Sequence, residues 1–200
     1  MLRAEQLAMS GGRAPISFAV ERGRCLGLLG PTPQHTSHLL LACAALARPV
    51  SGRVLINDTD TAANPEAARR QVAVARTQCV DERLHLREYL RAVARGRRAA
   101  GTTLRLSVTE MLARLDLDGA RALSSPEAQA EAAIAAALLP AVGLVVLDEP
   151  FAHLRSETRV RAIEWIRALA ADSAAVVIGG REERDLRAVS HTVVATEPAR

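Results

Sequence analysis

An apolar run that ends in two acidic residues is the clearest chemical signal in the sequence. Residues 144–147 are continuously apolar, which is typical of a strand buried on both faces of a parallel sheet, and Asp148, Glu149 and Pro150 follow directly. Ligands gather beyond the carboxyl ends of such strands, where an aspartate can hold Mg²⁺ and a neighbouring glutamate can polarise a water molecule. The alternative is a simple acidic turn after a strand, but the following Glu-Pro-Phe favours a functional origin.

Short apolar strands alternate with helices along the chain, and this alternation positions the acidic pair. Strands are predicted at residues 16–20, 25–29, 54–56, 72–75, 144–147, 174–178 and 192–195. Helices are predicted at residues 39–47, 84–98, 108–117, 126–139, 159–170 and 182–188, with loops at 31–38 and 57–64. This order predicts an α/β fold with a mostly parallel sheet and flanking helices. Residues 80–130 contain no strand candidate, so we expect a helical subdomain there within a single domain of residues 1–200.

The composition excludes several kinds of chemistry. All 26 basic residues are arginine, so no lysine can form a Schiff base, act as a general base or grip a phosphate. The net charge is only +4, and the few aromatic residues are insufficient for stacking on bases, so we expect no nucleic acid partner. Cys25, Cys43 and Cys79 lack metal-like spacing, and the first two stand in apolar runs typical of buried thiols.

We expect neither a signal peptide nor a membrane span. Residues 1–13 lack an apolar core of the kind that signal peptides have. The longest uncharged run, residues 132–147, is shorter than the ~20 residues that cross a bilayer and is interrupted by Pro140 and Gly143. These features predict a cytoplasmic protein.

Three segments together resemble the ATP-binding cassette (ABC) ATPases, the nucleotide-binding subunits of ABC transporters. ISFAVERGRCLGLLGP resembles the strand pair that leads into the P-loop of this family, and SGRVLIND resembles the strand after its first helix. LSSPEAQAEAAIAAALLPAVGLVVLDEPFAHL resembles its block of signature, helix and Walker B strand. The resemblance covers nearly the whole chain and implies a P-loop NTPase-like fold. It further implies Glu149 as the catalytic residue and Ser37 and Asp148 as ligands of the Mg²⁺ in Mg-ATP.

The resemblance places the nucleotide-binding segment at residues 30–38, where the family pattern is G-P-N-G-A-G-K-S-T and this chain reads GPTPQHTSH. A P-loop works because consecutive backbone N–H groups point at the phosphates beside a helix N-terminus. Here Pro33 has no N–H and His35 carries a Cβ at a glycine position. Thr36 replaces the lysine, whose loss removes a contact worth ~1.5–3 kcal/mol. The implied nucleotide-binding residues are Gly30, Gln34, His35, Thr36, Ser37 and His38.

The family signature L-S-G-G-Q corresponds to LSSPE at residues 123–127, which makes Ser124, Ser125 and Glu127 the signature-like residues. Ser124 and Glu127 have the spacing of a capping box at a helix start. Glu127 also places a carboxylate where the family would dock a γ-phosphate, so an anion already occupies this helix end. We therefore expect a structural cap at this position.

The other family positions offer one candidate match and several residues of a different type. Gln78 is the candidate for the glutamine loop. Arg155 stands where the family has an aspartate at its dimer interface, and residues 179–180 fall near the position of the switch histidine. Residues 9–12 lack the aromatic side chain that stacks on adenine.

The residue types at these positions predict a pseudo-ATPase in which Mg-ATP binding is weak or absent. The resemblance implies a transmembrane permease as partner, a homo- or heterodimer with another ABC ATPase subunit, and a peripheral location at the inner face of the membrane. An arginine stripe on the predicted helix 84–98 could face acidic permease loops or lipid headgroups, or simply solvent. The stripe consists of Arg87, Arg91, Arg95 and Arg98. Two alternatives stay open, which are an active ATPase with non-standard phosphate contacts and a soluble scaffold.

Overall fold

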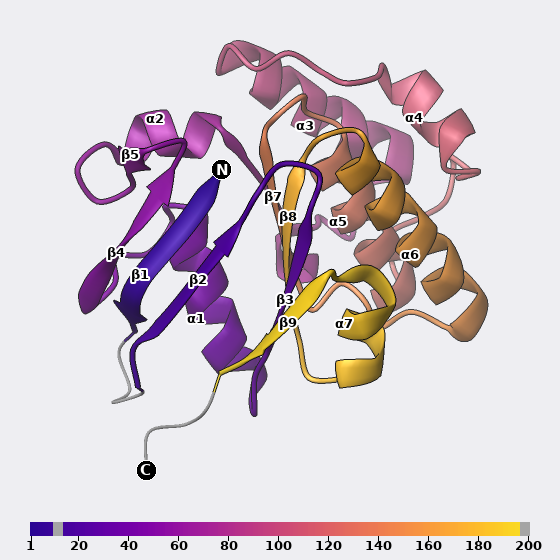
Figure 1. Ribbon diagram of the computed structural model, residues 1–200. Helices are drawn as coiled ribbons and strands as arrows, with labels where there is room; N and C mark the ends of the chain where they lie inside the picture. Colours follow the sequence, from indigo (N-terminus) through magenta and orange to yellow (C-terminus); the bar gives the residue numbers. More distant parts are fainter. Residues whose placement is uncertain (10–13, 197–200) are drawn as a thin grey trace.

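The chain folds around a five-stranded parallel sheet beside a smaller antiparallel sheet (Figure 1). The computed structural model describes residues 1–9 and 14–196. The parallel sheet has the order β6-β7-β8-β3-β9, with bounds Val72–Ala75, Leu144–Asp148, Ala175–Gly180, Cys25–Leu29 and Thr192–Ala195. The antiparallel sheet has the order β2-β1-β4-β5, with bounds Ile16–Val20, Leu2–Ala8, Ser51–Ile56 and Thr59–Asp60. The predicted α/β fold with a mostly parallel sheet is confirmed.

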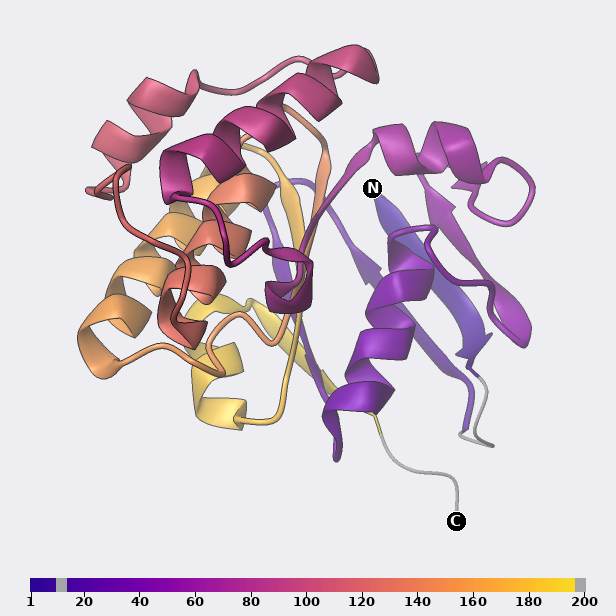
Figure 2. The ribbon, with the colours of Figure 1, turned by 180° about the vertical axis from the view of Figure 1, so that it is seen from behind.

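Helices cover both faces of the parallel sheet. Helix α1 (Pro33–Cys43) lies between the two sheets, as Figure 2 shows from behind. Helices α5 (Pro126–Leu138), α6 (Ser156–Ala171) and α7 (Glu183–Val189) pack on the opposite face. Successive residues of β7 alternate between these two cores, since Val146 packs with α1 and Val145 with α5 and α6. A strand buried on both faces must be apolar throughout, which explains its continuous apolar run.

Helix α1 begins earlier than the sequence predicted. The prediction placed a polar loop up to residue 38, but the helix starts at Pro33 with Thr32 as its N-cap. Proline is favoured in the first helical turn because its fixed φ suits the helix and its missing N–H would have had no intrahelical partner. The apolar periodicity starts only at Leu39, so it marked the buried part of the helix and not its beginning.

Strand β1 was not predicted, because a bulge interrupts its alternation. Leu2 and Ala4 are buried on one face, but Gln6 has a φ of 48° and shifts the register, so that Leu7 is buried next. The expected loop at residues 57–64 contains the short β5. Helix α2 (Pro65–Arg70), also not predicted, follows this segment.

Between β6 and β7 the chain forms helices joined by turns and loops, with two isolated β-bridges and no strand among its described residues. It contains the 3₁₀ turn η1 (Thr77–Cys79), α3 (Leu86–Ala99), α4 (Val108–Arg114) and α5. Helix α3 turns Leu86, Leu90 and Ala94 inward, whereas Arg91, Arg95 and Arg98 are exposed. None of the helices in the described part of the chain is both long and apolar enough to cross a membrane.

Two of the three thiols lie in the core, as predicted. Cys25 and Cys43 are buried, and burial raises the pKa of Cys25 to about 11 and that of Cys43 to about 12. Cys79 in η1 is exposed. Because the thiolate is the reactive form, the two buried thiols are inert at neutral pH.

A buried carboxylate joins α5 to α6. The Glu131 side chain in α5 is only 1% exposed, and it pairs with Arg121 before this helix and with Arg161 of α6. Nη2 of Arg161 lies 3.1 Å from Oε1 of Glu131. Burial nevertheless raises the pKa of Glu131, because desolvation outweighs the two guanidinium groups. The two helices are therefore held together by a paired charge inside an otherwise apolar contact.

We predict that Glu131→Ala lowers the free energy of unfolding by ~3 kcal/mol, because it leaves two guanidinium groups without their buried partner. Urea denaturation followed by circular dichroism measures this change. Glu66→Ala is the matched control, since Glu66 pairs with Arg70 at an exposed site and is expected to cost less than ~1 kcal/mol. Equal effects of the two substitutions would contradict the structural role of Glu131.

Candidate functional site

The predicted site residues gather where the carboxyl ends of β3, β7 and β8 meet. Asp148 is the last residue of β7, and Gly30 directly follows β3. Gly179 stands near the end of β8, and its carbonyl accepts a hydrogen bond of 3.1 Å from the backbone N–H of Glu149. The parallel topology thus brings three separate sequence motifs to a single edge of the sheet.

Thr36, at the position where the resemblance implies a lysine, is a core residue. Its side chain is completely buried and lies against two glycines. A Cβ on Gly30 would be 2.6 Å from Cγ2 of Thr36, and a Cβ on Gly179 would be 3.1 Å from Cβ of Thr36. The Thr36 hydroxyl donates to the Pro33 carbonyl at 3.1 Å. Thr36 therefore fills the space between the ends of β3 and β8.

The segment in front of Thr36 is a helical turn and not an extended loop. Because α1 begins at Pro33, only Pro31 and Thr32 separate it from Gly30. The His35 N–H donates to the Thr32 carbonyl at 3.2 Å, and Pro33 has no N–H to donate. Most of the polar loop predicted at residues 31–38 is thus replaced by the first turns of α1.

The structure divides the side chains predicted to bind nucleotide. His35 and Thr36 point into the core, with 7% and 0% exposure, whereas Gln34 and His38 are exposed on α1. Nε2 of His35 is buried and has no hydrogen-bond partner in the described part of the chain. Of this group, Ser37 alone reaches the Asp148 side chain.

Asp148 is held by a hydroxyl and a guanidinium. The Ser37 hydroxyl donates to Oδ1 at 2.8 Å, so the two predicted metal ligands do lie together. Nε of Arg76, which follows β6, lies 3.4 Å from Oδ2. Burial raises the pKa of Asp148, and the Ser37 hydrogen bond and the Arg76 charge oppose this rise. Arg76 escaped the sequence analysis because only the adjacency of β6 and β7 brings it here.

Glu149 follows in a left-handed backbone conformation with a φ of 49°. Burial raises its pKa, and Arg181, with Nε 3.8 Å from Oε1, opposes the rise. Arg181 comes directly after Gly179 and Gly180, near which the resemblance implies a switch histidine. The candidate catalytic carboxylate is therefore half-buried beside a cation from the same chain.

A cavity of about 280 Å³ lies at this edge, with Ser37, Asp148 and Glu149 in its wall. Gln78, the predicted glutamine-loop residue, also lines it from η1 and accepts a hydrogen bond of 3.0 Å from Nη2 of Arg76. Among the residues that the structure describes, no group of three or more His, Cys, Asp or Glu side chains is arranged to hold a metal ion. Oxygen ligands for a cation are thus limited at this cavity to a small set around Asp148.

The signature-like segment caps two helices, in a different way from the one predicted. The N-cap of α5 is Ser125, whose hydroxyl accepts from the Ala128 N–H, and not Ser124. Oε1 of Glu127 instead accepts from the backbone N–H of Arg155 at 3.1 Å and from the Thr158 hydroxyl at 2.8 Å, at the start of α6. The backbone and hydroxyl donors lower the pKa of Glu127. The expected capping box of Ser124 with Glu127 is wrong, because Glu127 caps the neighbouring helix.

Arg155 occupies the N-cap position of α6, and its Nε lies 3.4 Å from Oε2 of Glu127. The side chain of Arg155 is 87% exposed, so this ion pair is a surface contact. The expected absence of an adenine-stacking aromatic concerned residues 9–12, and residues 10–13 lie outside the described part of the chain.

Residues 14–152 match the family model for the ABC transporter, which is more than half of the chain. The chain belongs to the ABC transporter family. It is 29% identical over 206 residues to the thiamine import ATP-binding protein ThiQ of Cereibacter sphaeroides, covering 100% of this chain and 83% of that protein. It is 30% identical over 160 residues to the sulfate/thiosulfate import ATP-binding protein CysA of Synechococcus elongatus, covering 77% of this chain and 46% of that protein.

Solved structures of this family share the fold. A structure of the ATP-binding subunit of an ABC transporter superposes with a TM-score of 0.81 at 22% identity, covering 98% of this chain and 86% of that one. The dimeric ATP-binding cassette MJ0796 bound to ADP and Pi gives 0.79 at 17% identity, covering 100% and 99%. The chain spans less than half the length of several curated relatives that it matches, such as 46% for CysA.

We predict that Gly30→Ala lowers the free energy of unfolding by ~1–3 kcal/mol, because the new Cβ collides with the Thr36 methyl group. Thr36→Ser removes that methyl group but keeps the hydroxyl, so in the double variant it should recover part of the loss. Denaturant titration of the two single variants and the double variant measures the coupling. Strictly additive effects would contradict the packing of Thr36 against Gly30.

Proposed function

We propose that this chain is a nucleotide-binding-domain subunit of an ABC transporter that supports or regulates a permease without hydrolysing ATP efficiently. The burial of Thr36 between Gly30 and Gly179 carries this proposal, because it puts a neutral, packed side chain where a phosphate-binding lysine and loop would be needed. A triphosphate at this position would have to displace a core side chain and unwind the first turn of α1. In this reading the whole chain is a single cassette domain with a helical subdomain at about residues 80–130.

Arginines of the same chain add support. Arg76 lies beside Asp148, Arg181 beside Glu149 and Arg155 beside Glu127. Phosphoryl transfer depends on positioning and charge stabilisation by metal and cations around the phosphate. Here each motif carboxylate already faces a guanidinium, so a Mg²⁺ ion at Ser37 and Asp148 would compete with Arg76. These residues therefore fit a Mg-triphosphate poorly.

The partners follow from the relatives. ThiQ and CysA are named as import ATP-binding proteins, and MJ0796 was solved as a dimer. We propose a transmembrane permease and a second ABC ATPase subunit, identical or different, as the partners of this chain at the inner face of the membrane. The exposed arginines of α3 provide a cationic face for acidic permease loops or lipid headgroups, with Arg91, Arg95 and Arg98 in no ion pair of the described residues.

Calorimetric titration with Mg-ATP tests the proposal. We expect no heat of binding at micromolar nucleotide. We also expect no rise in the unfolding temperature, whereas a ligand that bound at 100 times its Kd would add ~2.7 kcal/mol to the free energy of unfolding. Any residual phosphate release should be the same in the wild type and in Glu149→Gln. Micromolar binding together with turnover that falls in Glu149→Gln would instead establish the active ATPase, the alternative that the short contact between Ser37 and Asp148 favours.

A second prediction concerns Arg76. Arg76→Leu should raise the affinity of the chain for Mn²⁺, a probe for Mg²⁺ sites, at least ~5-fold, because Asp148 loses its fixed counter-charge. Electron paramagnetic resonance of free Mn²⁺ measures the binding. Arg83→Leu is the control, since Arg83 pairs with the exposed Asp81 outside the cavity. Tight Mn²⁺ binding by the unaltered chain would show that Arg76 does not compete with a metal ion.

A further inference from the structure

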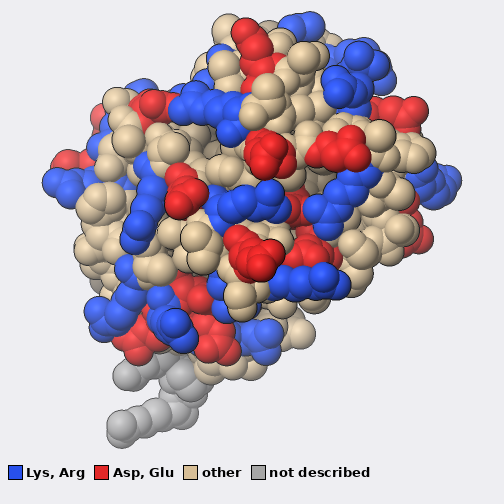
Figure 3. All heavy atoms as spheres, turned by 90° about the vertical axis from the view of Figure 1, so that its right-hand side faces the viewer, with Lys and Arg blue, Asp and Glu red and all other residues tan. Residues whose placement is uncertain are grey.

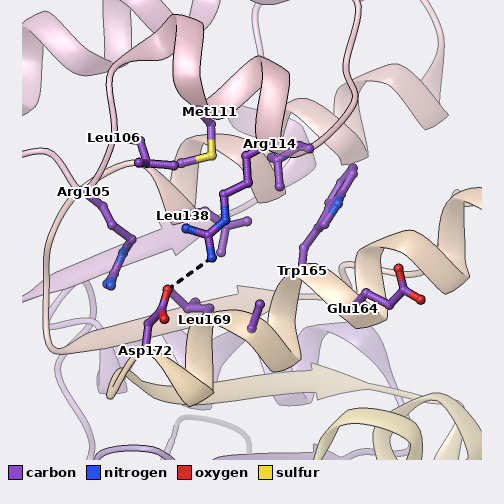
Figure 4. A pocket seen from close by; sticks show the side chains of 11 residues that line it. Arg105, Leu106, Met111, Arg114, Leu138, Glu164, Trp165, Leu169 and Asp172 are labelled. Atoms are coloured by element: carbon purple, nitrogen blue, oxygen red, sulfur yellow. Dashed lines mark ion pairs between the residues drawn. The ribbon is translucent and has the colours of Figure 1, made fainter.

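A second cavity, of about 230 Å³, lies far from the carboxyl edge of the sheet, between α4, the end of α5 and α6 (Figure 4). Its walls are mainly apolar, and they contain the single tryptophan of the chain, Trp165. The apolar lining consists of Leu106, Met111, Leu115, Leu138, Trp165 and Leu169. Ligand sites commonly combine such walls with a few polar groups that fix orientation.

Arg105 supplies a polar group at one end of this cavity. Its backbone N–H donates to the Leu139 carbonyl at 2.8 Å, next to the bridge between Leu104 and Pro140, so its position is fixed on the segment that follows α5. Its guanidinium makes only one long hydrogen bond, 3.5 Å from Nη2 to the Val142 carbonyl. Nε is buried without a partner, and no carboxylate of the described chain pairs with this side chain. Of its five N–H donors, the one on Nε is thus buried without a partner, and one on Nη2 makes the single bond to the protein.

The other charges on the cavity do not supply the missing acceptor. Arg114 and Asp172 form their own ion pair at 3.5 Å, the dashed line in Figure 4, and both side chains are about half exposed. Glu164 lies on the far side of Trp165 from Arg105 (Figure 4). The cavity therefore has a cation without an acidic partner at Arg105, an ion pair of Arg114 with Asp172, one further acid at Glu164, and otherwise apolar walls. Buried donors are normally paired, so the buried Nε of Arg105 leaves a place for an acceptor that the described chain does not provide.

The surface that carries α6 has no large patch of positive charge in Figure 3, so the unpaired charge at Arg105 is confined to the cavity. Blue arginine and red acidic side chains alternate over it without a large patch of one sign (Figure 3). A macromolecular partner steered by charge would meet a balanced surface there. A small anion that enters the cavity would find Arg105 without an acidic partner, whereas Arg114 is already paired with Asp172, and its apolar part would meet the apolar wall.

We propose that this cavity binds a small carboxylic acid with an apolar body, such as an aliphatic acid of medium length. The carboxylate accepts hydrogen bonds from the Arg105 guanidinium, whose planar fork matches it in two-point contact. The hydrocarbon body packs against Met111, Leu138 and Trp165. Binding at this place links α4 to α6 and does not involve the residues at the carboxyl edge, so it is independent of whether the chain binds ATP.

Octanoate titration of the full chain, followed by the fluorescence of Trp165, tests the proposal. We expect a saturable change with a Kd of ~1 mM or tighter, since a ligand of this size can reach that affinity through burial and one charged contact. Arg105→Gln should weaken binding ~10-fold or more. Arg95→Gln, which removes an exposed arginine of α3, should leave the Kd unchanged. Octan-1-ol, which has the same chain without the charge, should bind at least ~10-fold more weakly.

Two readouts keep the result decisive. Circular dichroism establishes whether Arg105→Gln is folded. If it is not, Arg105→Lys replaces it and should weaken binding ~5-fold, because the charge stays but the two-point contact is lost. Octanoate should raise the unfolding temperature of the wild type and of Arg95→Gln, but not that of Arg105→Gln. The proposal is overturned if ~10 mM octanoate produces no saturable change, or if the wild type and Arg105→Gln respond equally.

Discussion

The packing of Thr36 against Gly30 and Gly179 is the contact on which the carboxyl edge of the sheet depends. The two glycines leave room at the ends of β3 and β8, which Thr36 fills, together with Leu40 next to Gly179. The buried hydroxyl needs an acceptor, and it finds one in the Pro33 carbonyl because α1 has already begun there. The helix start, the glycines and the threonine are therefore mutually dependent. The His35 N–H, which could face a ligand, is used within the helix turn.

Arginine carries every positive side-chain charge of this chain, and the structure uses it to neutralise carboxylates internally. Arg76 approaches Asp148, and Arg121 and Arg161 enclose Glu131. Guanidinium groups suit this purpose because they stay charged when partly buried and offer several donors in a plane. At both the site and the scaffold, these acidic groups are balanced by arginines that lie outside their own strand or helix. Arg105 has no acidic partner among the described residues, and unlike the exposed Arg91, Arg95 and Arg98 it lines a cavity.

Sequence reasoning succeeded where structure depends on local patterns and failed where it depends on long-range contacts. The strand at residues 192–195 and the buried run of β7 were predicted because continuous apolar residues leave little choice. The contact of Ser37 with Asp148 followed from the family resemblance. In contrast, β1 was hidden by its bulge at Gln6. The partners of Asp148 and Glu127 on neighbouring elements could not be found from spacing alone.

The Glu127 carboxylate has a mechanical consequence. Together with Glu131 it joins one side of α5 to α6. Glu127 bonds the start of α6, and Glu131 pairs with Arg161. A movement of α5 away from α6 would have to break the contacts of Glu127 and Glu131 together, since these residues lie about one turn apart on the same helix. A displacement of α3 or α5 is thus passed on to α6 through these two contacts, because the described chain offers no free hinge between α5 and α6 at this side.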